Sequence, residues 1–310
     1  MAALLKRAGK AVLRVAPVHA AAMRAAAARG NGLALLYHRV TADDAEPPSD
    51  LVPSIPRRLL RRQLEVLGEV GELVPLERLP APAVDRRRPR FGLSFDDDYR
   101  SHGEQVLPIL QALGVTGTFF LSGRSLHGLG AYWFESLEQL VAEQGLDNIR
   151  RRLGVDAATG ADLAALCERS PRLQRLVTTA VDLAPRHLRA PQITELAEAG
   201  MAVGFHTLHH RRLVDLDGEG LRLALAHGRQ ALEGAIGRRV DLLAYPHGKA
   251  DARVAAAART AGYRMAWTGW PRPVRASDDP FLLGRWEPGP LQTDAFLAAL
   301  AVRVNRAAPP

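Results

Sequence analysis

The chain has 310 residues and a single cysteine, Cys167, which excludes a fold held together by its own disulfide bonds. The length suits one large α/β domain with an insertion, and contents of 47% hydrophobic and 24% charged residues are typical of a globular protein. The formal net charge of +8 comes mostly from arginine, with no aromatic-basic module beside it, so we expect no nucleic-acid partner.

Residues 1–30 combine apolar and basic side chains, and no uninterrupted apolar run in them is long enough for a signal-peptide core or a membrane span. The pattern predicts a basic amphipathic helix that either packs on the domain or rests on an anionic membrane surface. We therefore expect a cytoplasmic protein without a cleaved export signal, with peripheral membrane contact through this segment as the alternative.

From residue 31 onward, short apolar runs alternate with segments of helical periodicity. The first run ends at His38, and a Pro-, Asp- and Ser-rich loop at 41–56 follows on the same face as that strand end. A helix closes at Gly114, because glycine suits the C-cap position. The elements expected up to residue 121 are strands at 33–37, 72–75, 91–94 and 115–121 and helices at 56–70 and 106–113.

Residues 136–190 have leucines at helical spacing but no chemical motif, which predicts an all-helical insertion that shapes substrate access or contacts a partner. Cys167 is expected in it as a small buried hydrophobic residue. Beyond it we expect strands at 201–205, 241–245, 263–267 and 281–286 and helices at 191–199, 216–236, 250–261 and 293–304. This alternation predicts an α/β fold, a distorted (β/α) barrel of about seven units over residues 31–290, with a C-terminal helix and tail at 291–310.

Two polar motifs follow strands of the expected barrel. Asp96-Asp97-Asp98 stands at the end of one strand, and the segment from His206 to His210 follows another. The carboxyl ends of parallel strands share one face, and α/β folds bind ligands on that face. Both motifs therefore point at one site.

The residue types at this site allow metal-assisted hydrolysis. One carboxylate and two imidazoles supply three protein ligands for a divalent ion such as zinc and leave a position open for water. His206 and His210 are four residues apart, so one turn of helix would put both on one face, with Asp97 as the third ligand. His209 is three residues from His206 and suits a helix equally well. Asp96 then remains as the general base toward the activated water.

A tight turn forms a further part of the expected site. Tyr245, Pro246 and His247 lead into Gly248 at the carboxyl end of the 241–245 strand. Backbone N–H groups of such a turn would serve as an oxyanion hole for the tetrahedral intermediate of amide hydrolysis.

The two motifs have a counterpart in a known family. Ser94-Phe95-Asp96-Asp97 together with His206-Thr207-x-x-His210 resembles the paired signature of polysaccharide deacetylases, the NodB-homology group of carbohydrate esterase family four. The resemblance covers roughly residues 31–290. Three more segments resemble family motifs, Gly117-Thr118-Phe119-Phe120, Ala244-Tyr245-Pro246-His247-Gly248 and Leu36-Tyr37-His38-Arg39, the last as in poly-N-acetylglucosamine deacetylases with permuted motif order.

The resemblance implies a role for each motif residue. Asp96 corresponds to the catalytic base, and Asp97, His206 and His210 correspond to the metal ligands, which favours His210 over His209. The metal implied is one divalent ion, zinc in the first place, with cobalt or nickel as alternatives. The fold implied is the deacetylase barrel that the alternation of elements also predicts.

The resemblance also implies the acid and the substrate. His38 corresponds to the general acid of the permuted members, which protonates the leaving amine. Trp133 or Tyr132 either stacks on a sugar ring or anchors the insertion to the barrel. The substrate implied is an N-acetylated polysaccharide or glycoconjugate.

The chain departs from the family pattern at three places. Asp98 replaces the usual glycine, and its carboxylate would alter the turn, add a ligand or raise the pKa of Asp96. Ala244 stands where many members have the arginine that orients the base, so another group is needed, and Arg285 or Trp286 is expected at the border of the site. No leucine-rich strand ending in histidine occurs near the C-terminus. Two alternatives follow: a catalytically inactive carbohydrate-binding relative, or a hydrolase of a non-sugar amide or ester.

Overall fold

The fold is a parallel sheet curled into a distorted barrel, as expected. The computed structural model describes residues 17–43, 51–83, 85–180 and 187–306. Within these residues the sheet has seven strands, and each pair of hydrogen-bonded neighbours runs parallel. In spatial order the strands are β1 (Gly32–Tyr37), β5 (Arg90–Asp96), β6 (Thr118–Leu121), β7 (Ala202–Phe205), β8 (Leu242–Ala244) and β9 (Met265–Trp267), with β4 (Glu72–Leu73) paired to the start of β5.

The barrel is closed by an irregular segment rather than by the expected strand at 281–286. Two isolated parallel bridges join this segment to the sheet, Leu35 with Trp286 and Leu283 with Trp267. Gly284 lies between them, where a Cβ atom would come within 2.6 Å of a backbone carbonyl oxygen. The close approach at a glycine interrupts the ladder, so the gap between β9 and β1 is bridged without a continuous strand.

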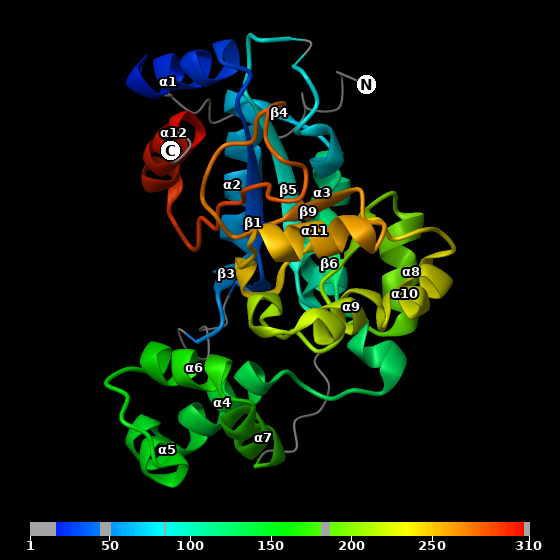
Figure 1. The fold of residues 1–310 in the computed structure, drawn as a ribbon. Coiled ribbons are helices and arrows are strands. Elements are labelled where there is room, and N and C mark those ends of the chain that lie inside the picture. Colours follow the sequence, from blue (N-terminus) through cyan, green and yellow to red (C-terminus); the bar gives the residue numbers. More distant parts are fainter. Residues whose placement is uncertain (1–16, 44–50, 84, 181–186, 307–310) are drawn as a thin grey trace.

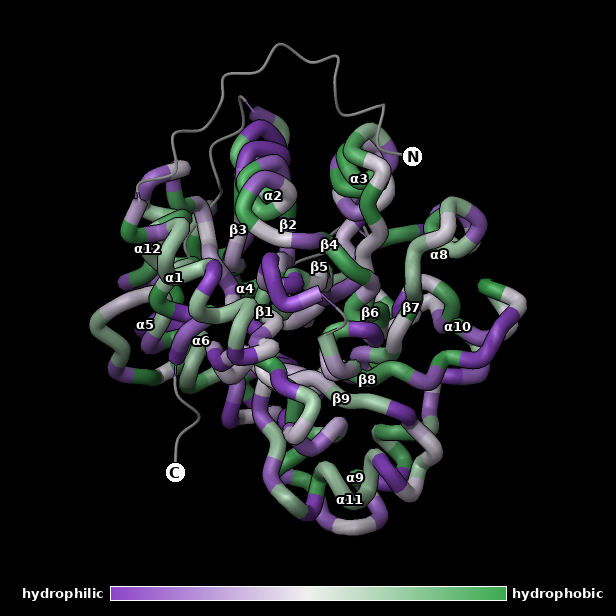
Figure 2. The backbone as a smooth tube through the Cα atoms, turned by 90° about the horizontal axis from the view of Figure 1, so that it is seen from above, coloured by the Kyte–Doolittle hydropathy of each residue, from purple (hydrophilic) through white to green (hydrophobic). Residues whose placement is uncertain are grey.

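Helices surround the strands. Seen from above in Figure 2, the strands lie inside a ring of helices, as the parallel connections require. The helix α2 buries Leu60, Leu64 and Leu67, which recur at helical spacing. The surrounding helices are α2 (Arg57–Val70), α3 (Leu107–Leu113), α8 (Ala190–Glu198), α9 (Gly218–Ala226), α10 (Arg229–Ile236), α11 (Ala252–Thr260) and α12 (Thr293–Asn305).

The expected helix at 216–236 is two helices, α9 and α10, and the prediction of one continuous helix was wrong. The chain breaks at Gly228, whose φ of 91° lies in the region that favours glycine. A Cβ atom there would lie 3.0 Å from the Cβ of Leu208, in the histidine segment. The break therefore lets the chain pass close to the turn that carries His206 and His210.

The N-terminal segment is described only from residue 17. Helix α1 (Pro17–Ala28) buries Met23, Ala26 and Ala27 and packs against α12, which fits the packing alternative for this part of the segment. Residues 1–16 and 307–310, which belong to the expected N-terminal helix and C-terminal tail, lie outside the described residues. Among the described helices, none combines the length and the apolar character needed to cross a membrane.

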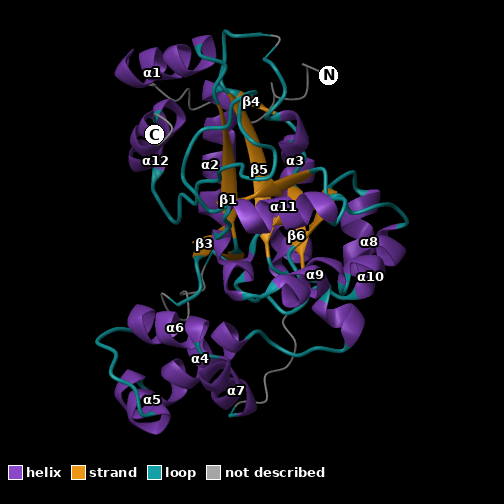
Figure 3. Cartoon of the chain, in the orientation of Figure 1, coloured by secondary structure: helices purple, strands orange, loops and turns teal. Residues whose placement is uncertain are grey.

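The helical insertion forms a separate lobe beside the barrel (Figures 1 and 3). Its small core includes Cys167, which is fully buried as expected. Two side-chain pairs connect its first helix to residues outside the lobe: Arg39 donates two hydrogen bonds of 2.6 and 2.9 Å to Glu138, and His187 Nε2 lies 2.9 Å from Glu135 Oε2. The helices of the lobe are α4 (Trp133–Gln144), α5 (Leu146–Leu153), α6 (Gly160–Arg169) and α7 (Pro171–Thr179).

A short two-stranded sheet, β2 (Arg39–Thr41) with β3 (Ser54–Pro56), follows β1 directly. It brackets the predicted loop and brings Leu51, Val52 and Pro53 to the carboxyl edge of the barrel, on the face expected for that loop. The loop therefore borders the site, although residues 44–50 lie outside the described part of the chain.

Gly204 in β7 provides a test of how tightly the barrel is packed under the site. A Cβ atom at this position would lie 2.4 Å from the Phe120 ring and 3.1 Å from a backbone oxygen, so we expect Gly204→Ala to lower the free energy of unfolding by about 1–3 kcal/mol. Gly234 in α10 has open space instead, and Gly234→Ala should raise that free energy by about 0.5–1 kcal/mol. Urea denaturation of both variants measures the difference, and equal stabilities would contradict this packing.

Candidate metal centre and active site

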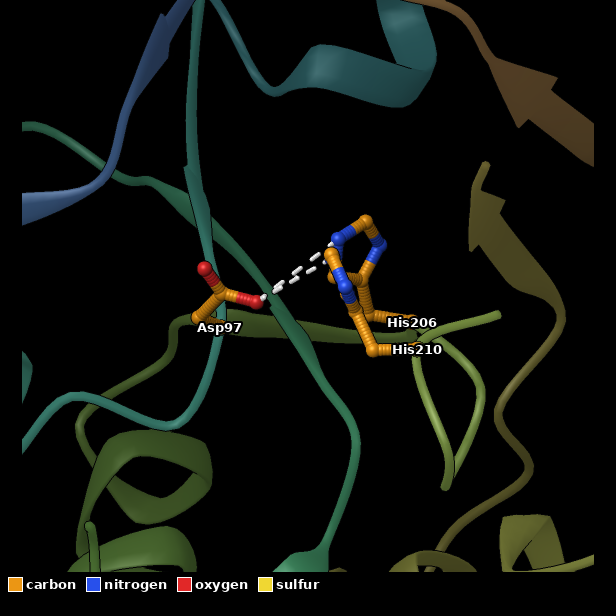
Figure 4. Close-up of side chains that lie close together, drawn as sticks. All are labelled: Asp97, His206 and His210. Atoms are coloured by element: carbon orange, nitrogen blue, oxygen red, sulfur yellow. Dashed lines mark ion pairs between the residues drawn. The ribbon is translucent and has the colours of Figure 1, made fainter. Parts of the chain in front are cut away.

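Asp97, His206 and His210 come together at the carboxyl edge of the barrel (Figure 4). Asp97 Oδ1 lies 3.8 Å from His206 Nε2 and 3.6 Å from His210 Nε2, and all three side chains are buried. Two ligands bound at about 2.1 Å to one tetrahedral ion lie about 3.4 Å apart, so these separations fit a shared metal ion. In the described part of the chain this is the only group of three or more such side chains whose ligand atoms lie this close.

An unsatisfied oxygen of the group also fits a cation. Asp97 Oδ1 is buried and has no hydrogen-bond partner among the described residues. Burial raises the pKa of Asp97 to about 7, and the nearby carboxylates of Asp96, Asp98 and Glu135 contribute. A buried carboxylate oxygen without a partner is costly, so a divalent ion beside Asp97 Oδ1 would remove a cost that the protein alone leaves in place.

The histidines are held in the neutral form that binds metals. Burial lowers the pKa of His206 to about 4 and lowers that of His210 well below its ordinary value. His206 Nδ1 lies 2.9 Å from the carbonyl oxygen of Ala244, which can only accept, so this nitrogen carries the proton. His206 Nε2 therefore carries the lone pair, 3.8 Å from Asp97 Oδ1 and 3.7 Å from Asp96 Oδ2.

The two histidines meet through a turn, and the prediction of a helical turn was wrong. His210 N donates to the carbonyl of Thr207 at 3.3 Å, and both residues have positive φ, 47° and 57°. Asp97, with φ 70°, and His247, with φ 58°, are the other non-glycine residues with positive φ in the described chain. Left-handed backbone at non-glycine residues is unfavourable, and here all four instances belong to the site.

His209 lies apart from the metal group. Its side chain is exposed, and its ring faces His227 with ring centroids 5.6 Å apart. The turn thus directs His210 toward the metal group and His209 away from it. Sequence spacing alone did not distinguish the two residues.

Asp96 is held by Arg285. The guanidinium donates two hydrogen bonds to the carboxylate, of 2.6 and 2.7 Å, and both side chains are buried. Burial would raise the pKa of Asp96, but Arg285, His206 and His38 outweigh it, and the pKa is lowered. Arg285 is therefore the group that orients Asp96, the candidate base, where the sequence analysis expected it only at the border of the site.

His38 is paired with Glu287, which sequence reasoning missed. His38 Nδ1 lies 2.7 Å from Glu287 Oε1. Burial would lower the pKa of His38, but Glu287, with smaller effects of Asp97 and Asp96, raises it to about 9. A signal was present in the sequence, because Glu287 is two residues from Arg285 and side chains at i and i+2 of an extended segment share a face.

Asp98 acts on the backbone rather than on the metal group. Its fully buried carboxylate accepts hydrogen bonds from the N–H groups of Ser122, Gly123 and Arg124 at 2.7, 3.3 and 2.8 Å. The carboxylate is therefore occupied at the end of β6, and it is not part of the ligand group. One effect expected from the sequence was that Asp98 would raise the pKa of Asp96. The pKa of Asp96 is lowered, and Asp98 contributes to the raised pKa of Asp97.

The turn after β8 offers less than expected as an oxyanion hole. Tyr245 N donates to the carbonyl of Trp267 at 3.0 Å, and the hydroxyl of Tyr245 donates to a buried carbonyl. Pro246 has no N–H, and Gly248 N donates to the carbonyl of Tyr245 at 2.9 Å. The expectation for Tyr245 and Pro246 is therefore revised, and the N–H of His247, which lines the pocket, remains as the candidate donor.

These groups open into one pocket of about 460 Å³, a volume within the usual range for small-ligand sites. On the barrel side it is lined by the metal group, by Asp96 with Arg285 and by His38 with Glu287. The insertion contributes Trp133 and Phe134 to the opposite wall. Tyr132 is buried instead, bonded to Ser122 Oγ at 2.8 Å, so it supports the wall and Trp133 faces the pocket.

Several solved structures share the fold of this chain. The chain superposes on the deacetylase PplD of Streptococcus pyogenes with a TM-score of 0.59 and 16% identity, covering 87% of this chain and 97% of that one. IcaB from Ammonifex degensii gives a TM-score of 0.58 with 20% identity over 90% and 99%. A polysaccharide deacetylase from Bacillus cereus gives 0.59 with 16% identity over 89% and 69%.

The sequence itself matches a family. No curated protein matches the chain. The polysaccharide deacetylase family matches over residues 83–266, a span that includes the aspartate motif, the histidine motif and the turn after β8. Since this match covers more than half of the chain and contains every residue of the candidate metal centre, the chain belongs to the polysaccharide deacetylase family.

Proposed function

We propose that this hydrolase of amide C–N bonds is a metal-dependent enzyme that removes N-acetyl groups from an N-acetylated polysaccharide or glycoconjugate. The observation that carries the proposal is the buried group of Asp97, His206 and His210. The candidate base Asp96 with Arg285 and the candidate acid His38 with Glu287 line the same pocket. The family match supports deacetylation. The metal-dependent chemistry and the sugar substrate are inferred from the donor set and the lining of the pocket.

The metal we infer is zinc, with cobalt or nickel as alternatives. Two imidazoles and one carboxylate are a donor set that zinc takes in hydrolases, with a position left for water. When bound, such an ion lowers the pKa of a water molecule and polarises the substrate carbonyl. Asp97, His206 and His210 would hold it.

The remaining groups move protons. Asp96 is ionised because Arg285 lowers its pKa, so it accepts a proton from the attacking water. His38 keeps its proton because Glu287 raises its pKa, so it donates that proton to the leaving nitrogen. The N–H of His247 would donate to the developing oxyanion. The two pKa values are shifted in opposite directions, which matches the opposite roles of base and acid.

Acetate release from N-acetylglucosamine oligomers tests this function. We expect release by the wild-type protein and a loss of about 10²-fold or more in Asp96→Asn, because the base is removed while the shape is kept. Oligomer binding without acetate release would favour the inactive carbohydrate-binding alternative. Hydrolysis of an aryl acetate without release from sugars would favour a non-sugar substrate.

Bound-metal content tests the ligand group. We expect about one zinc ion per wild-type chain after reconstitution, and less than about a tenth of that in Asp97→Ala and in His210→Ala, because each removes one of three ligands. His209→Ala is the matched control, since His209 is the neighbour of His210 but is exposed and faces away. Equal metal content in all four proteins would rule out this ligand set.

The pH dependence of turnover tests the acid pair. His38 acts in its protonated form, so wild-type activity should fall as pH rises through about 9. In Glu287→Gln the main group that raises the pKa of His38 is gone, so the alkaline limb should move to lower pH, toward the ordinary value of about 6.5. Glu219→Gln, at an exposed pair with Arg222, is the control. An alkaline limb that does not move in Glu287→Gln would exclude His38 as the acid.

A further inference from the structure

The helical insertion reaches the active site through one face of α6. Ala161, Ala164, Ala165 and Glu168 line the pocket, and their spacing of three, four and seven residues places them on a single helix face. On another face of the same helix, Leu163 and Cys167 are buried in the core of the lobe. The side of α6 toward the pocket therefore carries three methyl groups and one carboxylate.

Glu168 connects this face to the barrel. Its Oε1 lies 3.4 Å from Arg212 Nε, 3.4 Å from His247 Nδ1 and 3.7 Å from Lys249 Nζ. These distances exceed those of ordinary hydrogen bonds, and Oε1 is buried with no hydrogen-bond partner in the described part of the chain. The carboxylate is therefore attracted by charge to two barrel side chains, Arg212 and Lys249, and it also lies beside the ring of His247.

The partners of Glu168 belong to the segments that build the metal centre. Arg212 follows the histidine turn, and His247 and Lys249 follow β8. The ring of His247 lies against that of His210 with centroids 4.6 Å apart, and its Nε2 lies 3.3 Å from the carbonyl oxygen of His210. Glu168 thus contacts, from α6, the residues that lie beside the metal centre.

We propose that α6 is the specificity wall of this enzyme and that Glu168 is the positioning residue that holds the wall against the barrel. This inference rests on the proposed function. An N-acetylated sugar ring enters between the catalytic groups of the barrel and the methyl groups of Ala161, Ala164 and Ala165. Small side chains let the ring lie close to the helix, and Trp133 at the start of α4 contributes a larger apolar surface to the same wall.

The position of the wall should matter for a sugar chain and not for a small ester. In Glu168→Gln and Glu168→Ala we expect the KM for an N-acetylglucosamine pentamer to rise about five- to tenfold, because the charge that holds α6 is lost. Turnover of an aryl acetate should stay within about twofold, since it needs only the barrel groups. Glu143→Gln is the matched control, because it removes the same charge from an exposed position of the lobe, where Glu143 accepts a hydrogen bond from Gln139 within α4.

A second variant fills the pocket without changing the charge. Ala165 is exposed toward the pocket, so Ala165→Phe should fold normally, keep its metal and raise the KM for the pentamer by about tenfold or more. Hydrolysis of the aryl acetate should again be preserved. This variant tests the wall even if the Glu168 variants lose stability.

Three results would overturn the inference. An unchanged KM for the pentamer in Ala165→Phe and in both Glu168 variants would show that the sugar does not contact α6. An equal loss of kcat on the pentamer and on the aryl acetate would show that Glu168 acts only through His247 on the metal centre. A wild-type protein that hydrolyses the aryl acetate but no N-acetylated sugar would refute the proposed function and this inference with it. The first two results would refute the inference alone and leave the proposed function standing.

Discussion

The buried ion pair between Asp96 and Arg285 is the contact on which the arrangement of the site depends. It joins the end of β5 to the irregular segment that closes the barrel, across 189 residues of sequence. Arg285 also donates to Ser94 Oγ and to the carbonyl of Thr268, at 3.2 and 3.1 Å, so one guanidinium connects the ends of β5 and β9. Burying both charges is costly, and only such complete hydrogen bonding makes the pair tolerable. The closing segment is therefore held at the point where its Glu287 reaches His38.

Three consecutive carboxylates at the end of β5 have three different surroundings. Asp96 meets a guanidinium, Asp97 meets two neutral imidazoles, and Asp98 meets three backbone N–H groups. Successive side chains of a strand point to opposite sides, and the left-handed backbone at Asp97 redirects the chain between them. The same residue type thus serves as a candidate base, a candidate ligand and a structural acceptor, because the environment decides its charge and its contacts.

The barrel and the insertion contribute in different ways. The barrel is shared with solved structures that are 16–20% identical to this chain, so its geometry persists where most side chains differ. The insertion has its own apolar core and touches the site through a few side chains of α4 and α6. Residues of the lobe that line the pocket can therefore change without disturbing the metal centre. This makes the lobe the part of the chain suited to substrate selection.

Much of the site could be predicted from the sequence, because short-range patterns carry it. Alternating apolar runs located most strands and therefore their carboxyl ends, and residue type then singled out Asp97, His206 and His210 as candidate ligands. Gly114 ends α3 in the left-handed conformation expected of a C-cap. These features depend on residues a few positions apart, whose periodicity is readable without the fold.

Only the tertiary structure decided the partners. The segment at 281–286 is apolar enough for a strand, yet the position of its neighbours reduces it to single bridges. The pairs of Asp96 with Arg285 and of His38 with Glu287 join residues 189 and 249 positions apart, and no local pattern encodes which charge meets which. The separation of His209 from His210, and the turn of Asp98 toward the end of β6, likewise follow from backbone angles that the packed chain imposes. The sequence by itself determined which groups gather at the carboxyl edge of the barrel, and closure of the barrel determined how they pair.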